Sequence, residues 1–471
     1  MTDCGYPRRA RRAAANQNTT TEGETRQMKP SKFKFLLLLI VAIASLALVA
    51  CGGDDEEEGT PAATQPAGQT ATAVASPTTV KAYDEGASDT EIKIGGCYPF
   101  SGPAAAYGTI GKSAAAYFKM VNEQGGVNGR KINFITYDDQ YSPDKAVQCA
   151  RTLVEQDKVL FVFNTLGTPS NTAIWDYLNQ QKVPHIFVAT GATKWGENPE
   201  AHPWTMGWQP YYQAESAIYV EYLNKEKPNA KVAILYQNDD YGKDYLEGFK
   251  KALGAKYSQV VVKEATYATS DASVAPQVAQ LKESGADVFY IIATPKFATQ
   301  ALVAAAQIGW KPLILLNSVS SSIPAVMKPA MDQAGADAVS NVITTVYIKD
   351  PADPEWANDP AMKEYLDFMK KYYPDGNPND GFNVYGYSVA RTLVEGVLKR
   401  AGDNLTRENI MKMATSIKDL RIDTLLPGIL INTAPNDYYP IEAEQLAKFD
   451  PAKATWVRFG EVIDVSKKRT G

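Results

Sequence analysis

The chain has 471 residues, of which 45% are hydrophobic and 21% charged, so it is long enough for two globular domains with sizeable cores and additional segments. Its net charge is only -5 at pH 7, and the part expected to fold carries no basic stripe, which excludes the electrostatic footprint of a nucleic-acid-binding protein. The two histidines and the scattered carboxylates form no metal-ligand pattern.

The N-terminal region predicts export and a lipid anchor. Residues 1–27 are interpreted as an over-extended start, so that 28–50 form a signal peptide. Its apolar run, 35–49, would be about 22 Å long as a helix, which is short for the roughly 30 Å core of a bilayer. The run ends in Leu-Val-Ala-Cys, which resembles the lipobox of bacterial lipoproteins, with Cys51 as the lipidated residue on the outer face of the cell membrane. A transmembrane helix that contains a cysteine by chance is the alternative.

Residues 51–88 are first acidic and then rich in Ala, Thr, Pro and Gly, with little to bury, so they predict a disordered tether after the lipidated cysteine. Cys4 falls in the removed segment and Cys51 is the lipid site. Cys97 and Cys149 are therefore the thiols left in an exported chain, and they are a candidate disulfide.

Strand and helix patterns alternate through the body of the chain. The first lobe is expected over 89–210, with strands at 91–97, 131–137, 160–163 and 185–188 and helices at 107–122, 143–156 and 173–180. A second lobe, over 211–343, repeats the alternation with strands at 231–236, 259–265, 288–292 and 313–316. Alternation with short connections predicts doubly wound parallel sheets.

The C-terminal part does not continue the alternation of strands and helices. It has a strand pattern at 342–348, helical patterns at 362–372, 384–401 and 407–417, and two later strands. We expect 344–437 to complete the first lobe and 438–464 to complete the second. The predicted fold class is therefore α/β, with two Rossmann-like lobes joined by a multi-strand hinge.

The predicted topology bears on the two thiols. If the strands of the first sheet have the order 2-1-3, a right-handed crossover carries the helix containing Cys149 over the first strand, which ends at Cys97. Cys149 also lies on the apolar face of that helix. A disulfide is then geometrically feasible, and two buried free thiols are the alternative.

The loops after the strands are where ligands of such lobes bind. The loops at 98–108, 164–172 and 189–196 carry hydroxyls and amides at helix starts, which suit an anion such as a carboxylate. Aromatic residues of the same region, Tyr107, Tyr241 and Phe382 among them, can wall an apolar ligand body. The alternative for Thr168 and Thr193 is that they only cap helices.

Enzyme motifs are incomplete. Gly386-Tyr387-Ser388-Val389-Ala390 half-matches a nucleophile elbow, but no histidine follows it. Gly111-Lys112-Ser113 resembles the end of a P-loop, yet the required earlier glycine is Ala106. We predict no catalytic residue, no cofactor and no metal site.

Several longer motifs carry a family resemblance: "SGPAAAYG" at 101–108, "EQGGVNGRKI" at 123–132, "YDDQYSPDKAV" at 137–147 and "NDDYGKD" at 238–244. With the lipobox and the two lobes, they resemble the Leu/Ile/Val-binding type of ABC-importer solute-binding protein, which has the periplasmic binding protein type 1 fold. The resemblance covers about residues 90 to 462. It implies a monomeric binding module that closes on a small solute and delivers it to a membrane permease driven by a cytoplasmic ATPase.

The resemblance also implies site residues. Thr168 would receive a ligand carboxylate, and the loop Ala189, Thr190, Gly191 to Thr193 would supply amides or hydroxyls, with Thr190 and Thr193 competing for one role. Tyr107 and Tyr241 match the tyrosines that cover the ligand, with Phe382 as part of the aromatic wall. The family's own disulfide positions are Tyr141 and Gly167 here, so Cys97 and Cys149 would be a different pairing.

Two positions depart from the amino-acid binders of the family: Thr294 replaces a tyrosine, and Ser318 replaces the carboxylate that grips the α-ammonium group. A buried charge without its partner costs about 3 to 5 kcal/mol, or about two to four decades of affinity. We therefore expect an apolar monocarboxylate (aliphatic, keto or aromatic acid) rather than an amino acid, unless another acid such as Asp239 or Asp240 compensates. On this interpretation, Ser318→Glu would strengthen amino-acid binding.

Three alternatives remain at this point. The first is that the chain binds leucine, isoleucine or valine-type amino acids for import. The second is that it is a ligand sensor with the same fold, since fold does not fix function. A surface hydrolase is the third, and the absence of a suitably placed histidine argues against it.

Overall fold

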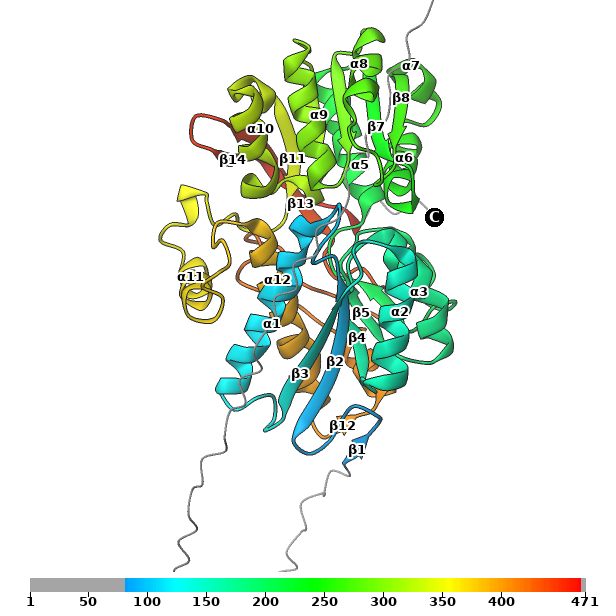
Figure 1. Cartoon of the computed structure of the whole chain (residues 1–471), viewed down its shortest axis with the longest axis vertical. Helices are drawn as coiled ribbons and strands as arrows, with labels where there is room; N and C mark the ends of the chain where they lie inside the picture. Colours follow the sequence, from blue (N-terminus) through cyan, green and yellow to red (C-terminus); the bar gives the residue numbers. More distant parts are fainter. Residues whose placement is uncertain (1–80, 467–471) are drawn as a thin grey trace, which may run out of the picture. The chain divides into compact units, whose positions relative to one another are not determined.

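The computed structural model describes residues 81–466, which form two lobes, each built on one large sheet with helices packed against it (Figure 1). The interpreted start at 1–27, the signal peptide at 28–50, Cys51 and most of the tether lie outside the described residues. Within the described part, none of the helices is long and apolar enough to cross a bilayer.

The first sheet has the strand order β3-β2-β4-β5-β6, and all its pairings are parallel. Its strands are β2 (Glu91–Tyr98), β3 (Lys131–Asp138), β4 (Phe161–Phe163), β5 (His185–Val188) and β6 (Thr205–Gly207). β4 and β5 are buried at every residue, as expected for parallel strands with both faces covered. The first three strands have the 2-1-3 order that the argument on the two thiols assumed, whereas β6 was not expected from the sequence.

Helices from two separate parts of the chain cover this sheet. They are α1 (Gly108–Glu123), α2 (Pro143–Arg151), α3 (Thr168–Gln180) and α4 (Lys194–Glu197), followed later by α11 (Pro360–Tyr372), α12 (Gly381–Leu393), α13 (Lys399–Ala401) and α14 (Arg407–Ala414). π-Helical turns adjoin α2 at Thr152–Gln156 and α12 at Val394–Leu398. The return of the chain to the first lobe therefore agrees with the sequence pattern.

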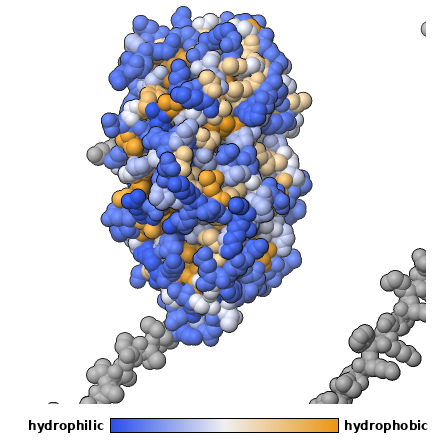
Figure 2. All heavy atoms as spheres, turned by 90° about the vertical axis from the view of Figure 1, so that its left-hand side faces the viewer, coloured by the Kyte–Doolittle hydropathy of each residue, from blue (hydrophilic) through white to orange (hydrophobic). Residues whose placement is uncertain are grey.

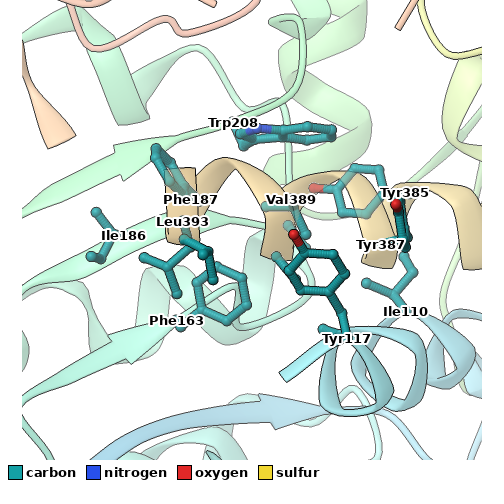
Figure 3. Packing of buried hydrophobic residues seen from close by; sticks show 14 of the residues in the cluster. Ile110, Tyr117, Phe163, Ile186, Phe187, Trp208, Tyr385, Tyr387, Val389 and Leu393 are labelled. Atoms are coloured by element: carbon teal, nitrogen blue, oxygen red, sulfur yellow. The ribbon is translucent and has the colours of Figure 1, made fainter. Parts of the chain in front are cut away.

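Helix α12 is the buried helix of this lobe. Its Val389 and Leu393 lie in the same core cluster as Phe163 of the sheet (Figure 3). A Cβ atom at Gly386 would lie 2.3 Å from the backbone oxygen of Ile110 in α1, so the glycine allows the two helices to approach closely. The segment that half-matched a nucleophile elbow is thus a helix-packing contact.

The second sheet has the strand order β14-β13-β11-β10-β9-β7-β8, with β13 and β14 antiparallel to their neighbours. Its strands are β7 (Val232–Gln237), β8 (Val261–Tyr267), β9 (Val288–Ile292), β10 (Leu313–Leu316), β11 (Val342–Val346), β13 (Ala443–Asp450) and β14 (Thr455–Asp464). Its helices are α5 (Tyr212–Glu226), α6 (Asp240–Leu253), α7 (Tyr257–Val260), α8 (Ala275–Glu283), α9 (Pro295–Gln307) and α10 (Lys328–Ala334), the last preceded by a π-helical turn at Ile323–Met327.

Three boundaries differ from the sequence expectation. All of β11 pairs within the second sheet, so the expected lobe boundary between 343 and 344 falls inside a strand. Helix α3 begins at Thr168 rather than 173, because Pro169 fits the first turn of a helix and Gly167, with φ of 100°, ends the preceding loop.

The third difference is the end of the expected tether. β1 (Ala82–Tyr83) pairs in parallel with β12 (Asn404–Leu405), so the described fold begins before residue 89. The Arg130 guanidinium lies 5.4 Å from the centre of the Tyr83 ring, and Arg130 Nη2 donates to the Tyr83 hydroxyl at 2.7 Å. These contacts give an otherwise polar segment a reason to be ordered.

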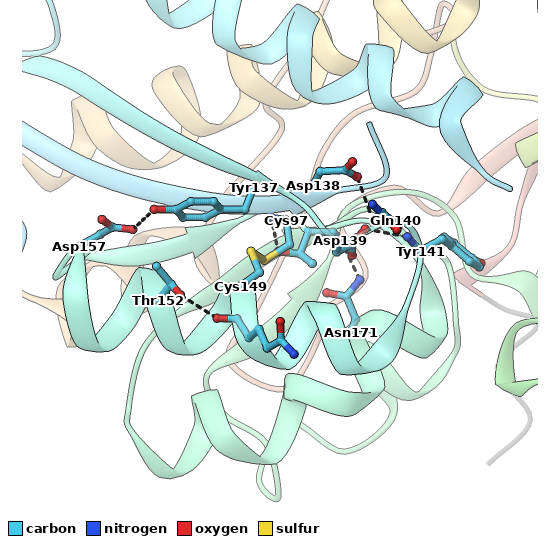
Figure 4. Close-up of a disulfide and its surroundings, with 12 residues drawn as sticks. Cys97, Tyr137, Asp138, Asp139, Gln140, Tyr141, Cys149, Thr152, Asp157 and Asn171 are labelled. Carbon is cyan, nitrogen blue, oxygen red and sulfur yellow. Dashed lines mark hydrogen bonds between the residues drawn. A yellow bond between two sulfur atoms is a disulfide. The ribbon is translucent and has the colours of Figure 1, made fainter. Parts of the chain in front are cut away.

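Cys97 and Cys149 are joined by a disulfide between the end of β2 and α2 (Figure 4). Both side chains are buried in a small cluster with Leu153 and Val162. The disulfide therefore lies beneath the edge of the sheet at which the loops that are expected to bind a ligand begin.

Figure 2 shows one face of the molecule, on which hydrophilic residues predominate and hydrophobic residues form scattered small groups. Individual large apolar side chains that are exposed in the described part include Val262, Leu430 and Val457. Scattered exposed apolar residues are normal for a folded surface.

The disulfide generates a stability prediction. It closes a loop with a sequence separation of 52, and on the chain-entropy model such a crosslink stabilises the folded state by about 4 kcal/mol. We expect Cys97→Ala/Cys149→Ala to lower the free energy of unfolding by about 2 to 4 kcal/mol in urea titrations without dithiothreitol. Dithiothreitol should then leave the double variant unchanged, and equal stability of the two proteins under non-reducing conditions would contradict the prediction.

Burial of His185 generates a pH prediction. Its ring is fully buried, neither ring nitrogen has a described hydrogen-bond partner, and burial lowers its pKa from 6.5 to about 3. Between these two pH values the unfolded chain binds a proton that the folded chain does not, so stability falls as pH falls, by about 1.4 kcal/mol per pH unit.

His185→Leu removes this protonation site. In urea titrations at pH 7, 6, 5 and 4 we expect the variant to gain stability over the parent chain progressively as the pH falls. The carboxylates common to both proteins cancel in that difference. A difference that is constant with pH would show that folding does not lower the pKa of His185.

Candidate ligand-binding cavity

A cavity lies between the two lobes and is lined by residues of both. Its volume is about 120 Å³, roughly ten times the space that one water molecule needs. Most of its wall is apolar or aromatic, formed by residues such as Tyr107, Ile110, Tyr141, Leu166, Tyr212, Tyr241, Val319, Val346, Tyr347, Ile348, Phe382, Tyr385 and Trp456. A mainly apolar pocket with a few polar groups is the usual form of a small-molecule site.

The structure brings most of the sequence-derived site residues into this wall. Those that line the cavity are Tyr107, Thr168, Ala189, Tyr241, Thr294, Ser318 and Phe382. Thr190, Gly191 and Thr193 lie outside the lining: Thr190 sits behind Thr168, Gly191 packs against Pro210 and Tyr212, and Thr193 bonds to Asp244 of α6.

Thr168 presents a hydroxyl donor at the N-terminus of α3. Its Oγ1 lies 2.6 Å from Thr190 Oγ1, and Thr190 Oγ1 already accepts from the Ala192 amide at 3.2 Å and from Trp195 Nε1 at 3.4 Å. Either hydroxyl can be the donor of the Thr168–Thr190 bond, and two donors already on the lone pairs of Thr190 favour Thr190 as that donor. With Thr190 as the donor, the Thr168 proton is available to a group in the cavity.

Gly167, directly before Thr168, allows the Tyr141 ring to pack closely against the start of α3. A Cβ atom at Gly167 would lie 2.5 Å from Cε2 of Tyr141, whose ring lines the cavity. Tyr141 and Gly167 are the positions of the family's disulfide. Here they are in contact through the tyrosine ring and not through a disulfide. Together the open Thr168 hydroxyl and the α3 N-terminus favour a carboxylate at this end of the cavity.

Ser318, on the opposite lobe, is backed by a buried acid. Its amide and its hydroxyl donate to the two carboxylate oxygens of Glu215, each at 2.7 Å. Tyr245 donates to the same carboxylate at 2.7 Å, and the Tyr219 hydroxyl lies 2.9 Å from it. Glu215 is 2% exposed, and burial raises its pKa.

Glu215 was missed by the sequence analysis, which treated position 318 as free of charge. One weak signal was present in the sequence, a glutamate in the first turn of a helix rich in tyrosine. Nothing local relates Glu215 to a serine 103 positions later, because their contact depends on how α5 packs against the end of β10. The basis for expecting Ser318→Glu to strengthen amino-acid binding is therefore removed.

Thr345 repeats this arrangement. Its hydroxyl, in the cavity wall, donates to Glu444 at 2.8 Å. Glu444 is fully buried, its second carboxylate oxygen has no described partner, and burial together with the nearby Glu215 raises its pKa. Ser318 and Thr345 thus commit their protons to acids behind the wall and present lone pairs to the cavity.

Tyr241 is held by the loop after β10. Asn317 Nδ2 donates to the Tyr241 hydroxyl at 2.7 Å, and the Ala293 amide donates to Asn317 Oδ1 at 3.1 Å. Burial raises the pKa of Tyr241, so its hydroxyl keeps its proton. This proton is available to a ligand.

The remaining serines of the 317–322 loop have structural roles. Ser320 donates to the Ala293 carbonyl, Ser321 to the Ser318 carbonyl at 2.7 Å, and Ser322 to Asp380 of the other lobe at 2.9 Å. The serine hydroxyls after β10 therefore stabilise the loop and form a hydrogen bond between the lobes.

Among the described residues, the acidic side chain in the cavity wall is Asp350. Asp239 and Asp240, which the sequence analysis suggested, have other roles. Asp239 caps α6 through the amides of Tyr241 and Gly242, and Asp240 pairs with Lys194 at 2.8 Å. Neither lines the cavity, whereas Asp350 does. Burial, with a smaller contribution from Asp353 and Asp380, raises the pKa of Asp350 to about 7.

Polar bonds connect the lobes around the cavity. Thr193 donates to Asp244 through its amide at 2.8 Å and its hydroxyl at 3.0 Å. The Lys194–Asp240 ion pair and the Ser322–Asp380 bond lie at other points of the lobe interface. Opening of the cavity would have to break these bonds.

Comparisons with known proteins are consistent with this geometry. A family model described as periplasmic binding protein matches residues 91–444. The Leu/Ile/Val-binding protein homolog 7 of Brucella abortus is 23% identical over 329 residues, which cover 66% of this chain and 78% of that protein.

Solved structures show the same fold. A fatty acid ABC transporter substrate-binding protein from Thermomonospora curvata superposes with a TM-score of 0.69 at 23% identity, covering 83% of this chain and 97% of that one. A branched-chain amino acid ABC transporter protein from Thermus thermophilus with bound valine gives a TM-score of 0.71 at 16% identity, covering 81% and 99%. The expected fold, two α/β lobes of the periplasmic binding protein type 1, is confirmed.

The Ser318–Glu215 contact generates a prediction. Ser318→Glu would remove a donor from Glu215 and add a second carboxylate beside it, and a buried charge without its partner costs about 3 to 5 kcal/mol. We expect urea titrations to show a loss of several kcal/mol, against a smaller loss, about 1.5 to 3 kcal/mol, for Ser318→Ala. A Ser318→Glu protein as stable as the parent chain, with increased leucine affinity, would contradict the role given to Glu215.

Proposed function

The chain belongs to the periplasmic binding protein family, and from that premise we propose that it is an exported solute-binding protein of the Leu/Ile/Val-binding type. Its solute is a small carboxylate with a mainly apolar body, captured between the lobes and delivered to a membrane permease driven by a cytoplasmic ATPase. The chain binds this solute without changing it chemically.

The single observation that carries the proposal is the pairing of a free Thr168 hydroxyl with the N-terminus of α3 in an otherwise apolar cavity. A helix N-terminus favours negative charge, and a hydrogen bond to a charged group contributes about 1.5 to 3 kcal/mol. Tyr241, whose proton is also free, lies on the other lobe. Bonds from both lobes to one solute would favour the closed arrangement.

The apolar body of the solute fits the aromatic wall. A nitrogen-free aliphatic, keto or aromatic acid is one candidate, and the fatty acid named for the Thermomonospora curvata protein supports it. A leucine-type amino acid is the other, supported by the names of the Brucella proteins and by the valine bound to the Thermus thermophilus protein. The sequence-based preference for a nitrogen-free acid assumed that no acidic side chain lines the cavity. Asp350 lines it, which weakens the argument against an amino acid.

The location and partners extend the proposal. Cys51 would carry the lipid anchor that holds the protein, as a monomer, on the outer face of the cell membrane. The lobe bonds from Lys194 and Ser322 would form on closure, and the closed surface would be what the permease recognises. A ligand sensor would use the same closure, and a histidine kinase encoded beside this gene, in place of a permease, would favour that role.

Ligand identification tests the proposal. Mass spectrometry of small molecules released from the purified protein is expected to find a carboxylic acid. In calorimetric titrations with leucine, 4-methylpentanoate and the neutral 4-methylpentanamide, we expect at least one of the two acids to bind at least tenfold more tightly than the amide, because only the acids carry a charge for the α3 N-terminus.

Thr168→Val keeps the shape of the side chain and removes its proton donor. We expect it to weaken the acid that binds by about 10 to 100-fold. Thr299→Val is the matched control, because Thr299 is buried, its hydroxyl has no described partner and it lies outside the cavity wall. Equal affinity for the amide and the acids, or an unchanged affinity in Thr168→Val, would overturn the proposed carboxylate site.

A further inference from the structure

The charged side chains of the cavity wall are unbalanced. In the described part of the chain, Lys349 and Asp350 are the lysine, arginine, aspartate or glutamate residues that line it. Lys349 Nζ is 2.7 Å from Asp359, and only 6% of the Lys349 side chain and 20% of the Asp359 side chain are exposed. The lysine is thus paired outside the cavity, and Asp350 is left as the acidic group of the wall without a cationic partner.

The Asp350 carboxylate has capacity left to accept hydrogen bonds. Among the described residues, one hydrogen bond to it is present, from the Ala352 amide to Oδ1 at 2.8 Å, and none of the ion pairs includes it. An ionised carboxylate can accept about four hydrogen bonds. The charged neighbours that act on it, Asp353 and Asp380, are themselves acids and cannot satisfy it.

The adjoining wall of the second lobe has the same polarity. Ser318 and Thr345 direct their hydroxyl protons to Glu215 and Glu444, so they too face the cavity as acceptors. A ligand group placed here is met by lone pairs and negative charge. Such surroundings select a hydrogen-bond donor, and a positively charged one most strongly.

We propose that Asp350 is a specificity-determining residue that receives a positively charged, N–H-bearing group of the solute. The solute is then a carboxylate that also carries an amino group, with its negative end at Thr168 and its positive end at the segment that follows β11. This inference rests on the proposed function, since it assigns the second end of the same solute.

The segment that carries Asp350 gives this assignment a structural setting. Lys349 donates its amide to the Thr424 carbonyl at 2.9 Å, which fixes the chain just before Asp350 on the first lobe. β11, a few residues earlier, belongs to the second sheet. Asp350 therefore lies where the chain passes from one lobe to the other, and a ligand bonded to it would contact this crossing directly.

Two matched probe pairs test the inference: leucine with 4-methylpentanoate, and 6-aminohexanoate with hexanoate. Within each pair only the amino group differs, at the α-carbon in the first pair and at the far end of the chain in the second. We expect the amino member of at least one pair to bind the parent chain at least tenfold more tightly than its nitrogen-free partner in calorimetric titrations. The pair in which the amino member binds more tightly shows how far the positive group of the solute lies from its carboxylate at Thr168.

Asp350→Asn keeps the size of the side chain and removes its charge. We expect it to reduce the preference for the amino member at least tenfold while leaving the nitrogen-free acid within about threefold of its parent affinity. Asp353→Asn is the matched control, since Asp353 lies three residues away and outside the cavity wall, and it should retain the preference. Thermal unfolding of each variant checks that it is folded.

The outcomes separate the two proposals. An unchanged preference in Asp350→Asn, or tighter binding of both nitrogen-free acids by the parent chain, overturns the role of Asp350 and leaves the carboxylate site standing. If none of the four acids binds the parent chain, the proposed carboxylate function fails, and the inference that rests on it fails with it.

Discussion

The wall of the second lobe depends on one buried carboxylate. Glu215 of α5 joins Ser318 after β10 and Tyr245 of α6 through short hydrogen bonds, with Tyr219 beside them. A buried charge is tolerated only when such bonds replace its lost hydration. The same bonds fix the loop whose Asn317 holds the Tyr241 hydroxyl, so the burial of Glu215 shapes this part of the wall and sets the polarity of Ser318.

The two lobes consequently offer opposite hydrogen-bonding groups to whatever enters between them. On the first lobe, Thr168 has a free proton at the positive end of α3. On the second, Ser318 and Thr345 have committed their protons to Glu215 and Glu444. Such a cavity is complementary to a solute with two different polar ends. The polarity of a site is therefore set as much by the residues behind its wall as by those in it.

Closure and recognition are linked through the same region. Lys194 and Asp240, Thr193 and Asp244, and Ser322 and Asp380 connect the lobes directly. Exposed ion pairs contribute little individually, about 1 kcal/mol or less. That magnitude applies to the Lys194–Asp240 pair, whereas the Thr193–Asp244 and Ser322–Asp380 bonds are more buried, and a hydrogen bond to a charged group contributes about 1.5 to 3 kcal/mol.

The sequence by itself determined the alternation of strands and helices and the loops that supply Thr168, Tyr241 and Ser318 to the cavity, because these follow from periodicity and from the edge at which parallel strands end. Only the tertiary structure decided that Thr190 and Thr193 both stay out of the wall, and that Glu215, Glu444 and Asp350 govern its charge. The physical reason is that a residue pattern reports whether a side chain is buried, whereas its partner is set by packing between elements as much as 103 positions apart.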